Sequence, residues 1–110
     1  MEDREHIPLT EAVYYILLAL QTPMHGYGIM QHVKEISNDR VNLGPGTLYG
    51  AIKTLLKKEW IQLVTREEAS RKKEYELTDT GKAIVFAEID RLQELLNNGK
   101  RIMEGKENDH

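Results

Sequence analysis

Residues 44–58 read GPGTLYGAIKTLLKK, and this stretch decides the fold. Its apolar side chains recur with spacings of four, three and one, which places them on one face of a helix. The opposite face begins with small residues and continues with lysines, a combination that suits the major groove of DNA. A solvated surface helix is the alternative that this stretch leaves open. The apolar face consists of Leu48, Ile52, Leu55 and Leu56, and the outward face of Thr47, Gly50, Lys53, Thr54 and Lys57.

Two short segments after this helix alternate between apolar and polar side chains, as half-exposed strands do. We expect Ile61 and Leu63 to point inward in the first segment, and Tyr75 and Leu77 in the second. The run between them, residues 65–73, is polar. This pattern predicts a two-stranded hairpin with a charged tip. A helix followed by such a hairpin is typical of a winged helix-turn-helix.

The predicted hairpin tip ends in three successive cations, Arg71, Lys72 and Lys73. In a winged helix the third helix enters the major groove, and the tip reaches the adjoining backbone or minor groove. A loop kept soluble by its charge is the alternative for a basic triplet. The neighbouring groove-type helix favours contact with DNA.

The net charge of −3 is unusual for a DNA-binding protein, so its distribution matters more than the total. Residues 44–73 hold seven Lys/Arg against three Glu, a balance of +4. Residues 1–43 carry −3 and residues 74–110 carry −4. The cations therefore gather where DNA contact is expected. Screening over about 8 Å at physiological salt reduces the influence of the distant acids.

Length and composition limit the class of protein. With 110 residues and 40% hydrophobic content, the chain makes one small domain, with or without an appended helix. No apolar run approaches the roughly 18 residues of a membrane helix, and the charged start does not resemble a secretion signal. The absence of cysteine excludes disulfides and thiolate metal sites. No catalytic or phosphate-binding motif occurs, so we expect a cytoplasmic protein that is not an enzyme and has no cofactor.

Two further helices precede residue 44. The first is expected to start after Thr10 as N-cap and to end before Pro23. Its apolar residues (Val13, Ile16, Leu17, Leu20) predict burial on more than one side, either centrally or against a partner chain. The second carries Ile29, Met30, Val33 and Ile36, and a turn that leads to Pro45 at the first position of the next helix completes a helix-turn-helix.

Three side chains near these helices carry functional alternatives. His25 is expected to form a structural hydrogen bond at the entry of the second helix, in preference to binding a metal. Tyr27 either contacts a DNA phosphate or packs in the core, and the sequence does not choose between them. Tyr49 lies between the two faces of its helix, so its ring is expected to pack while its hydroxyl reaches a phosphate.

A last helix is expected to follow Thr78 as N-cap and to run to about Asn97 or beyond, where the motif Asn97-Asn98-Gly99 stops or kinks it. About 20 helical residues extend roughly 30 Å, too far for one small domain to cover. We therefore predict a winged helix-turn-helix DNA-binding domain in residues 1–78. Residues 79–110 are expected to form a C-terminal dimerisation helix with a frayed tail. A helix folded back on its own domain is the alternative. The predicted dimer seam consists of Val85, Ile89, Leu92 and Leu96.

Taken together, these segments resemble the PadR family of bacterial transcriptional repressors. The resemblance rests on residues 25–29 (HGYGI), 46–49 (GTLY) and 71–81 (RKKEYELTDTG), and it spans roughly residues 9–96. It implies a homodimer that binds operator DNA and is released by a small molecule or a stress signal. The short C-terminal region is similar to the subfamily with a single long dimerisation helix.

The resemblance also implies site residues, and the chain departs from the family pattern in two places: the wing, and the last helix, where Phe86 is the one aromatic residue. The resemblance places Thr47, Tyr49 and Lys53 at the DNA, and residues 71–73 in the wing. Where the family wing often has glycine before its basic run, this chain has two glutamates, Glu67 and Glu68, which should repel phosphate.

Two such molecules related by a twofold axis would bind half-sites about 34 Å apart, so the operator is expected to be an inverted repeat. A winged-helix module that contacts protein instead of DNA is the alternative function.

Overall fold

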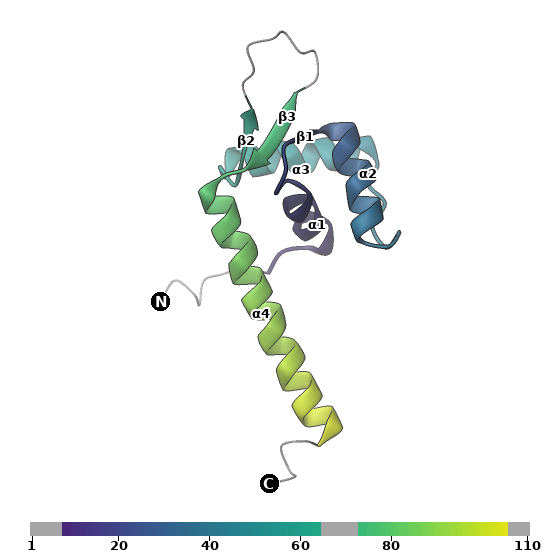
Figure 1. Cartoon of the computed structure of the whole chain (residues 1–110), viewed down its shortest axis with the longest axis vertical. Helices are drawn as coiled ribbons and strands as arrows, with labels where there is room; N and C mark the ends of the chain where they lie inside the picture. Colours follow the sequence, from purple (N-terminus) through teal and green to yellow (C-terminus); the bar gives the residue numbers. More distant parts are fainter. Residues whose placement is uncertain (1–7, 65–72, 106–110) are drawn as a thin grey trace.

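In the computed structural model, which describes residues 8–64 and 73–105, helices and a small sheet form a head from which one long helix projects (Figure 1). The head comprises α1 to α3 and the sheet, and the projecting helix is α4. This architecture confirms the predicted mainly helical winged fold. The elements, in chain order, are α1 (Glu11–Ala19), β1 (Met24–His25), α2 (Gly26–Ile36), α3 (Pro45–Lys57), β2 (Ile61–Val64), β3 (Glu74–Leu77) and α4 (Asp79–Glu104).

The sheet has three antiparallel strands in the order β1-β3-β2, where a two-stranded hairpin was expected. The hairpin itself is confirmed, with Ile61 opposite Leu77 and Leu63 opposite Tyr75. The additional strand β1 pairs Met24 with Tyr75 on the other side of β3. Two residues are too few for an alternating pattern to become visible in a sequence. The prediction of two strands was therefore wrong by one short strand.

Local capping signals are confirmed at four helix starts. The Thr10 hydroxyl accepts a hydrogen bond from the Val13 N–H at 3.1 Å, and the Thr78 hydroxyl accepts one from the Gly81 N–H at 3.0 Å. His25 Nδ1 accepts from the Gly28 N–H at 3.3 Å, the structural role predicted for this histidine. Pro45 occupies the first turn of α3. The two hydroxyls and the imidazole satisfy N–H donors that the helices leave without internal partners, whereas Pro45 has no N–H that needs one.

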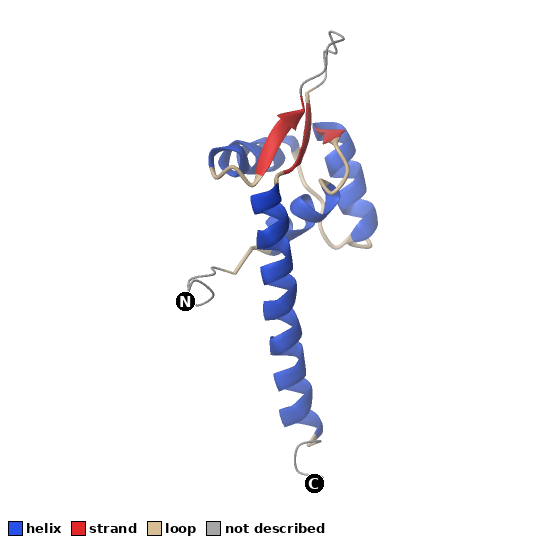
Figure 2. Ribbon diagram, turned by 60° about the vertical axis from the view of Figure 1, so that its left-hand side comes forward, coloured by secondary structure: helices blue, strands red, loops and turns tan. Residues whose placement is uncertain are grey.

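The core is built around α1, because its residues Ile16 and Leu17 and its C-cap Leu20 are inaccessible to solvent. Helix α2 packs against α1 and α3, and apolar side chains of α3, the sheet and the start of α4 belong to the same core (Figure 2). Full burial of each such side chain contributes about 1.5–3 kcal/mol. The predicted inward faces are thereby confirmed for Ile29, Val33, Leu48, Ile52, Leu55, Ile61, Tyr75 and Leu77.

Two side chains that were expected to point inward are exposed. Leu63 is 46% exposed, although Ile61 on the same edge strand β2 and its partner Tyr75 on the central strand are both buried. Ile36 is 37% exposed, since it is the last residue of α2. Periodicity shows which side of an element a residue occupies, but whether another element covers that side depends on the tertiary structure.

Helix α4 runs without interruption to Glu104, so the stop predicted at Asn97-Asn98-Gly99 is wrong. It ends at Gly105, whose φ of 69° is the left-handed conformation that glycine adopts readily. Twenty-six helical residues extend about 39 Å at 1.5 Å per residue. None of the helices in residues 8–64 and 73–105 combines the length and the apolar character needed to cross a bilayer.

Gly81 allows the first turn of α4 to approach Trp60, which lies between α3 and β2. A Cβ atom at this position would overlap the backbone carbonyl of Trp60 and lie 3.0 Å from a Leu77 methyl group. That carbonyl accepts the Thr78 N–H at 3.0 Å, so it cannot move away without loss of a hydrogen bond.

We therefore expect Gly81→Ala to lower the free energy of unfolding by about 1–3 kcal/mol through overpacking. Urea unfolding followed by circular dichroism measures this loss. Gly99→Ala is the matched control, because a Cβ there meets nothing within 4 Å and alanine favours the helix. Equal stability of the two variants would contradict the close approach at Gly81.

Candidate nucleic-acid interface

Helix α3 presents the two faces that its sequence predicts. Leu48, Ile52 and Leu55 are buried and fix the helix to the core. The outward residues Thr47, Gly50, Lys53, Thr54 and Lys57 are all exposed. The helix therefore offers an uncovered face that is small at its start and cationic towards its end.

Glycines make the first half of this face almost flat. A Cβ atom at Gly46 or Gly50 would meet nothing within 4 Å, so the fold itself does not require glycine at either position. The Thr54 hydroxyl donates to the Gly50 carbonyl at 3.3 Å, which keeps this polar group against the helix backbone. A surface of this shape permits another molecule to approach the α3 backbone closely.

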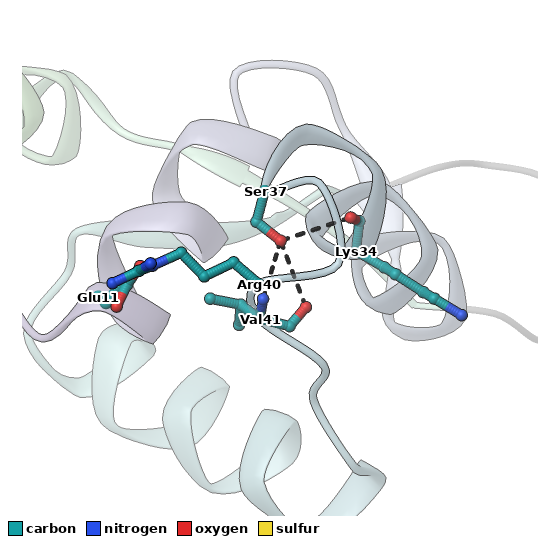
Figure 3. Close-up of polar contacts among 5 residues, drawn as sticks. All are labelled: Glu11, Lys34, Ser37, Arg40 and Val41. Atoms are coloured by element: carbon teal, nitrogen blue, oxygen red, sulfur yellow. Dashed lines mark hydrogen bonds and ion pairs between the residues drawn. The ribbon is translucent and has the colours of Figure 1, made fainter.

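A buried serine shapes the turn between α2 and α3 (Figure 3). Ser37 is 4% exposed, and its hydroxyl accepts the Val41 N–H at 2.9 Å while it lies 3.4 Å from the Lys34 carbonyl, to which it can donate. Asn38 and Asp39 follow with φ of 54° and 66°, the left-handed conformation that these residue types tolerate. An ion pair between Arg40 and Glu11 connects the turn to α1. The sequence analysis identified the break but missed these contacts; the Ser-Asn-Asp run was the available signal.

The two candidate tyrosines have different surroundings. Tyr27 is 62% exposed, so the core alternative for this residue is wrong, and its hydroxyl accepts from Gln31 Nε2 at 3.2 Å. Tyr49 is 49% exposed and packs its ring over Gly26, where a Cβ would lie 2.7 Å from the ring atom Cζ. The packing predicted for the Tyr49 ring is confirmed. Burial, with a contribution from nearby Tyr49, raises the pKa of Tyr75 above its usual value.

The wing is only partly within the described residues. Lys73, immediately before β3, is exposed. Arg71 and Lys72, the other predicted wing cations, lie outside the described residues, as do Glu67 and Glu68. Lys73 is therefore the wing cation that the structure brings to the same end of the sheet as Val64.

The predicted dimer seam is exposed except at its first member. Val85 is 7% exposed and belongs to the core of its own chain, so the uncovered part of the seam begins at Ile89. Sequence spacing could not show that Val85 is buried and Ile89 exposed, since both residues lie on the same face of the helix. Other large apolar side chains of α4 are also exposed, and the full set is Phe86, Ile89, Leu92, Leu95, Leu96, Ile102 and Met103. Single exposed apolar residues are common, whereas several along one helix are typical of an interaction surface.

Metal chemistry finds no support in this arrangement. Within residues 8–64 and 73–105, no group of three or more His, Asp or Glu side chains is placed to hold a metal ion. The arrangement instead combines the uncovered face of α3, an exposed lysine before β3, and a projecting helix with exposed apolar side chains.

Comparisons with known proteins agree with this geometry. A curated Streptomyces fradiae protein, "Uncharacterized 37.1 kDa protein in transposon TN4556", is 35% identical over 79 residues, which are 71% of this chain and 22% of that protein. The chain thus spans about a fifth of the length of this curated relative. The crystal structure of a Streptococcus mutans UA159 protein is 27% identical with a TM-score of 0.66, covering 91% of this chain and 94% of that one.

Two further solved structures carry the family name. A PadR-like transcription factor from Bacteroides fragilis is 26% identical with a TM-score of 0.67, covering 83% of this chain and 88% of the other. Bacillus subtilis PadR in complex with operator DNA is 28% identical with a TM-score of 0.60, covering 70% and 45%. The model of the transcriptional regulator PadR-like family matches residues 16–86, which include the whole helix-turn-helix, the sheet and the start of α4. This chain therefore belongs to the PadR-like family of transcriptional regulators.

Proposed function

We propose that this protein is a homodimeric regulator that binds an inverted-repeat operator through α3 and the wing, represses transcription there, and is released by a small molecule or a stress signal. The observation that carries the proposal is the uncovered, small and cationic face of α3 beside a fully buried docking face. Its contacts with DNA would come from Thr47, Tyr49, Gly50, Lys53 and Lys57, with Tyr27 from α2 and Arg71, Lys72 and Lys73 from the wing.

The chemistry of this face supports DNA over a protein partner. Lysines supply the charge that phosphates require, and the small residues before them let the helix enter a major groove about 12 Å wide. The operator complex of the Bacillus subtilis relative supports the same assignment, since its likeness covers 70% of this chain.

Dimerisation is supported by the projecting half of α4. Ile89, Leu92 and Leu96 lie on one face at spacings of three and four and are exposed within a single chain. Burial of this row against the same row of a second copy would remove it from water. A twofold dimer would then direct two α3 helices at two half-sites of one operator.

Release by an effector follows from the same geometry. Tight binding to an operator needs one separation of the two α3 helices, so a ligand that favours another separation lowers the affinity for DNA. We propose that the effector acts on α4, because this helix joins the two heads.

The proposal is tested by the salt dependence of binding to the DNA upstream of the protein's own gene. If each protomer neutralises about four phosphates, the slope of log affinity against log salt is about −7 for the dimer. Fluorescence anisotropy with labelled DNA measures the slope, and scrambled DNA is the control. A flat slope would favour the protein-binding alternative, whereas a steep slope with the same affinity for both DNAs would reject sequence-specific binding.

Gly50→Ala separates DNA contact from stability. A Cβ at this position has open space around it, so alanine should stabilise the helix by about 0.5–1 kcal/mol. If the helix backbone approaches DNA here, the added methyl group should weaken operator binding by about tenfold, the effect of roughly 1.4 kcal/mol of overpacking. Thermal unfolding and anisotropy measure the two effects. Higher stability with unchanged affinity would remove Gly50 from the contact surface.

A further inference from the structure

A buried carboxylate lies where α4 leaves the head of the molecule. Glu88 is 2% exposed, and it is the last buried residue of α4 in the part of this helix that the structure describes. Beyond it, the helix runs clear of the other elements in both views (Figures 1 and 2). The covered and the uncovered parts of α4 therefore meet at an ionisable side chain.

This carboxylate connects α4 to the start of α1. It accepts the Leu9 N–H at 3.3 Å, and Leu9 immediately precedes the N-cap of α1. Arg91, three residues further along α4 itself, donates to both carboxylate oxygens, at 2.9 and 2.6 Å, and so holds the carboxylate in place. Tyr14 of α1 also interacts with Glu88 electrostatically. Burial is the main cause that raises the pKa of Tyr14, and Tyr15 and Glu88 raise it further.

Such contacts restrict the direction of a helix more than apolar packing does. Hydrogen bonds to a carboxylate are directional and charge-assisted, and a buried charge without its partners is costly. An apolar side chain at the same place would tolerate a range of crossing angles, because hydrophobic burial has no direction. The contacts of Glu88 therefore favour one angle between α4 and α1.

A small change of this angle has a large effect at the far end of α4. The 16 residues from Glu88 to Glu104 extend about 24 Å, so a rotation of about 10° displaces the helix end by about 4 Å. This displacement exceeds the rise of about 3.4 Å per base pair in DNA. The separation of two heads joined through α4 thus depends strongly on the angle at Glu88.

We propose that Glu88 is a positioning residue for operator binding: its carboxylate, held by Arg91 of the same helix, accepts the Leu9 N–H and thereby sets the direction of α4 and the half-site spacing that the dimer accepts. The inference rests on the proposed function as a homodimeric DNA-binding protein. Glu88 itself touches no DNA. Its role is exerted through α4 on the separation of the two α3 helices.

Glu88→Gln tests the role of the charge, since glutamine keeps the size and an acceptor for the Leu9 N–H but loses the ion pair with Arg91. Glu94→Gln is the matched control, because it makes the same charge change at an exposed position of the same helix. The chain contains no cysteine, so a single Thr54→Cys substitution on α3 allows one spin label per protomer. Pulsed dipolar spectroscopy then measures the distance between the two labels without DNA.

We expect Glu88→Gln to broaden or shift this distance distribution and to weaken binding to the best-spaced operator by about tenfold, a typical coupling between sites. Affinity for a single half-site should stay within about twofold of wild type, because α3 is unchanged. The preference among operators whose spacers differ by one or two base pairs should also diminish. Glu94→Gln should behave as the wild type in all three measurements.

An unchanged distance distribution and spacer preference in Glu88→Gln would overturn the inference. If this variant does not fold, Arg91→Lys replaces it, since lysine keeps the cation but lacks the two-pronged geometry. A wild-type dimer that binds no operator rejects the proposed function, while its label distances still decide whether Glu88 sets the angle. A monomeric wild-type chain overturns both.

Discussion

Replacing Leu92 and Leu96 together with glutamate is expected to make the protein monomeric at micromolar concentration and to weaken operator binding by about 10²–10⁴-fold. The two leucines are 38% and 55% exposed in a single chain, so the substitutions should leave the head intact. In a dimer built on α4 they would bring four carboxylates into a desolvated interface, where unpaired charge is strongly unfavourable. The loss of affinity is the loss of bivalent attachment to two half-sites.

Sedimentation velocity measures the oligomeric state, and anisotropy measures the affinity of the same sample. Gln93→Glu serves as the control, because it adds a carboxylate at an exposed position outside the seam of the same helix. A double variant that sediments as the wild type would show that this face of α4 does not hold two copies together. A monomer that keeps full operator affinity would instead separate DNA binding from dimerisation.

Lys53→Ala is expected to weaken operator binding by about 1–3 kcal/mol in total over the two copies that each dimer carries. Lys53 is exposed in the middle of α3, on the face opposite the buried Ile52 and Leu55. If Lys53 contacts phosphate, the salt slope should also fall by about two, at 0.9 per contact in each protomer. The folded structure should be unaffected because the Lys53 side chain is exposed to solvent.

Lys100→Ala is the matched control for this experiment, because it removes the same charge from an exposed position on the outer half of α4. Equal affinity of both variants would remove Lys53 from the interface. A weaker affinity with an unchanged salt slope would indicate a base contact, and the loss should then depend on the base pair opposite Lys53.

Local signals in the sequence were sufficient for most of the fold. The spacing of Leu48, Ile52 and Leu55 predicted which face of α3 is buried, because helical geometry alone relates positions three and four apart. Thr10 and Thr78 predicted helix starts, since a cap bonds an N–H only three residues away. Such predictions succeed because the interactions that cause them lie within a few residues of one another.

The errors share a different physical origin. Leu63 and Val85 fit their patterns equally well, yet one is exposed on an edge strand and the other is buried in the core. The Asn97-Asn98-Gly99 motif favours a helix end locally, but α4 continues through it to Glu104. Strand β1 exists because β3 offers it a partner some 50 residues further along the chain. None of these outcomes is encoded in a local period.

The candidate interface divides in the same way. Composition and spacing alone indicated the outward residues of α3, the segregation of cations into residues 44–73, and the amphipathic nature of the last helix. Only the tertiary structure decided that Arg40 in the turn before α3 pairs with Glu11, that Tyr49 rests on Gly26, and that Glu88 contacts the start of α1. Periodicity records the face on which a side chain lies, whereas the neighbour it meets there depends on segments that the folded chain brings together from distant positions.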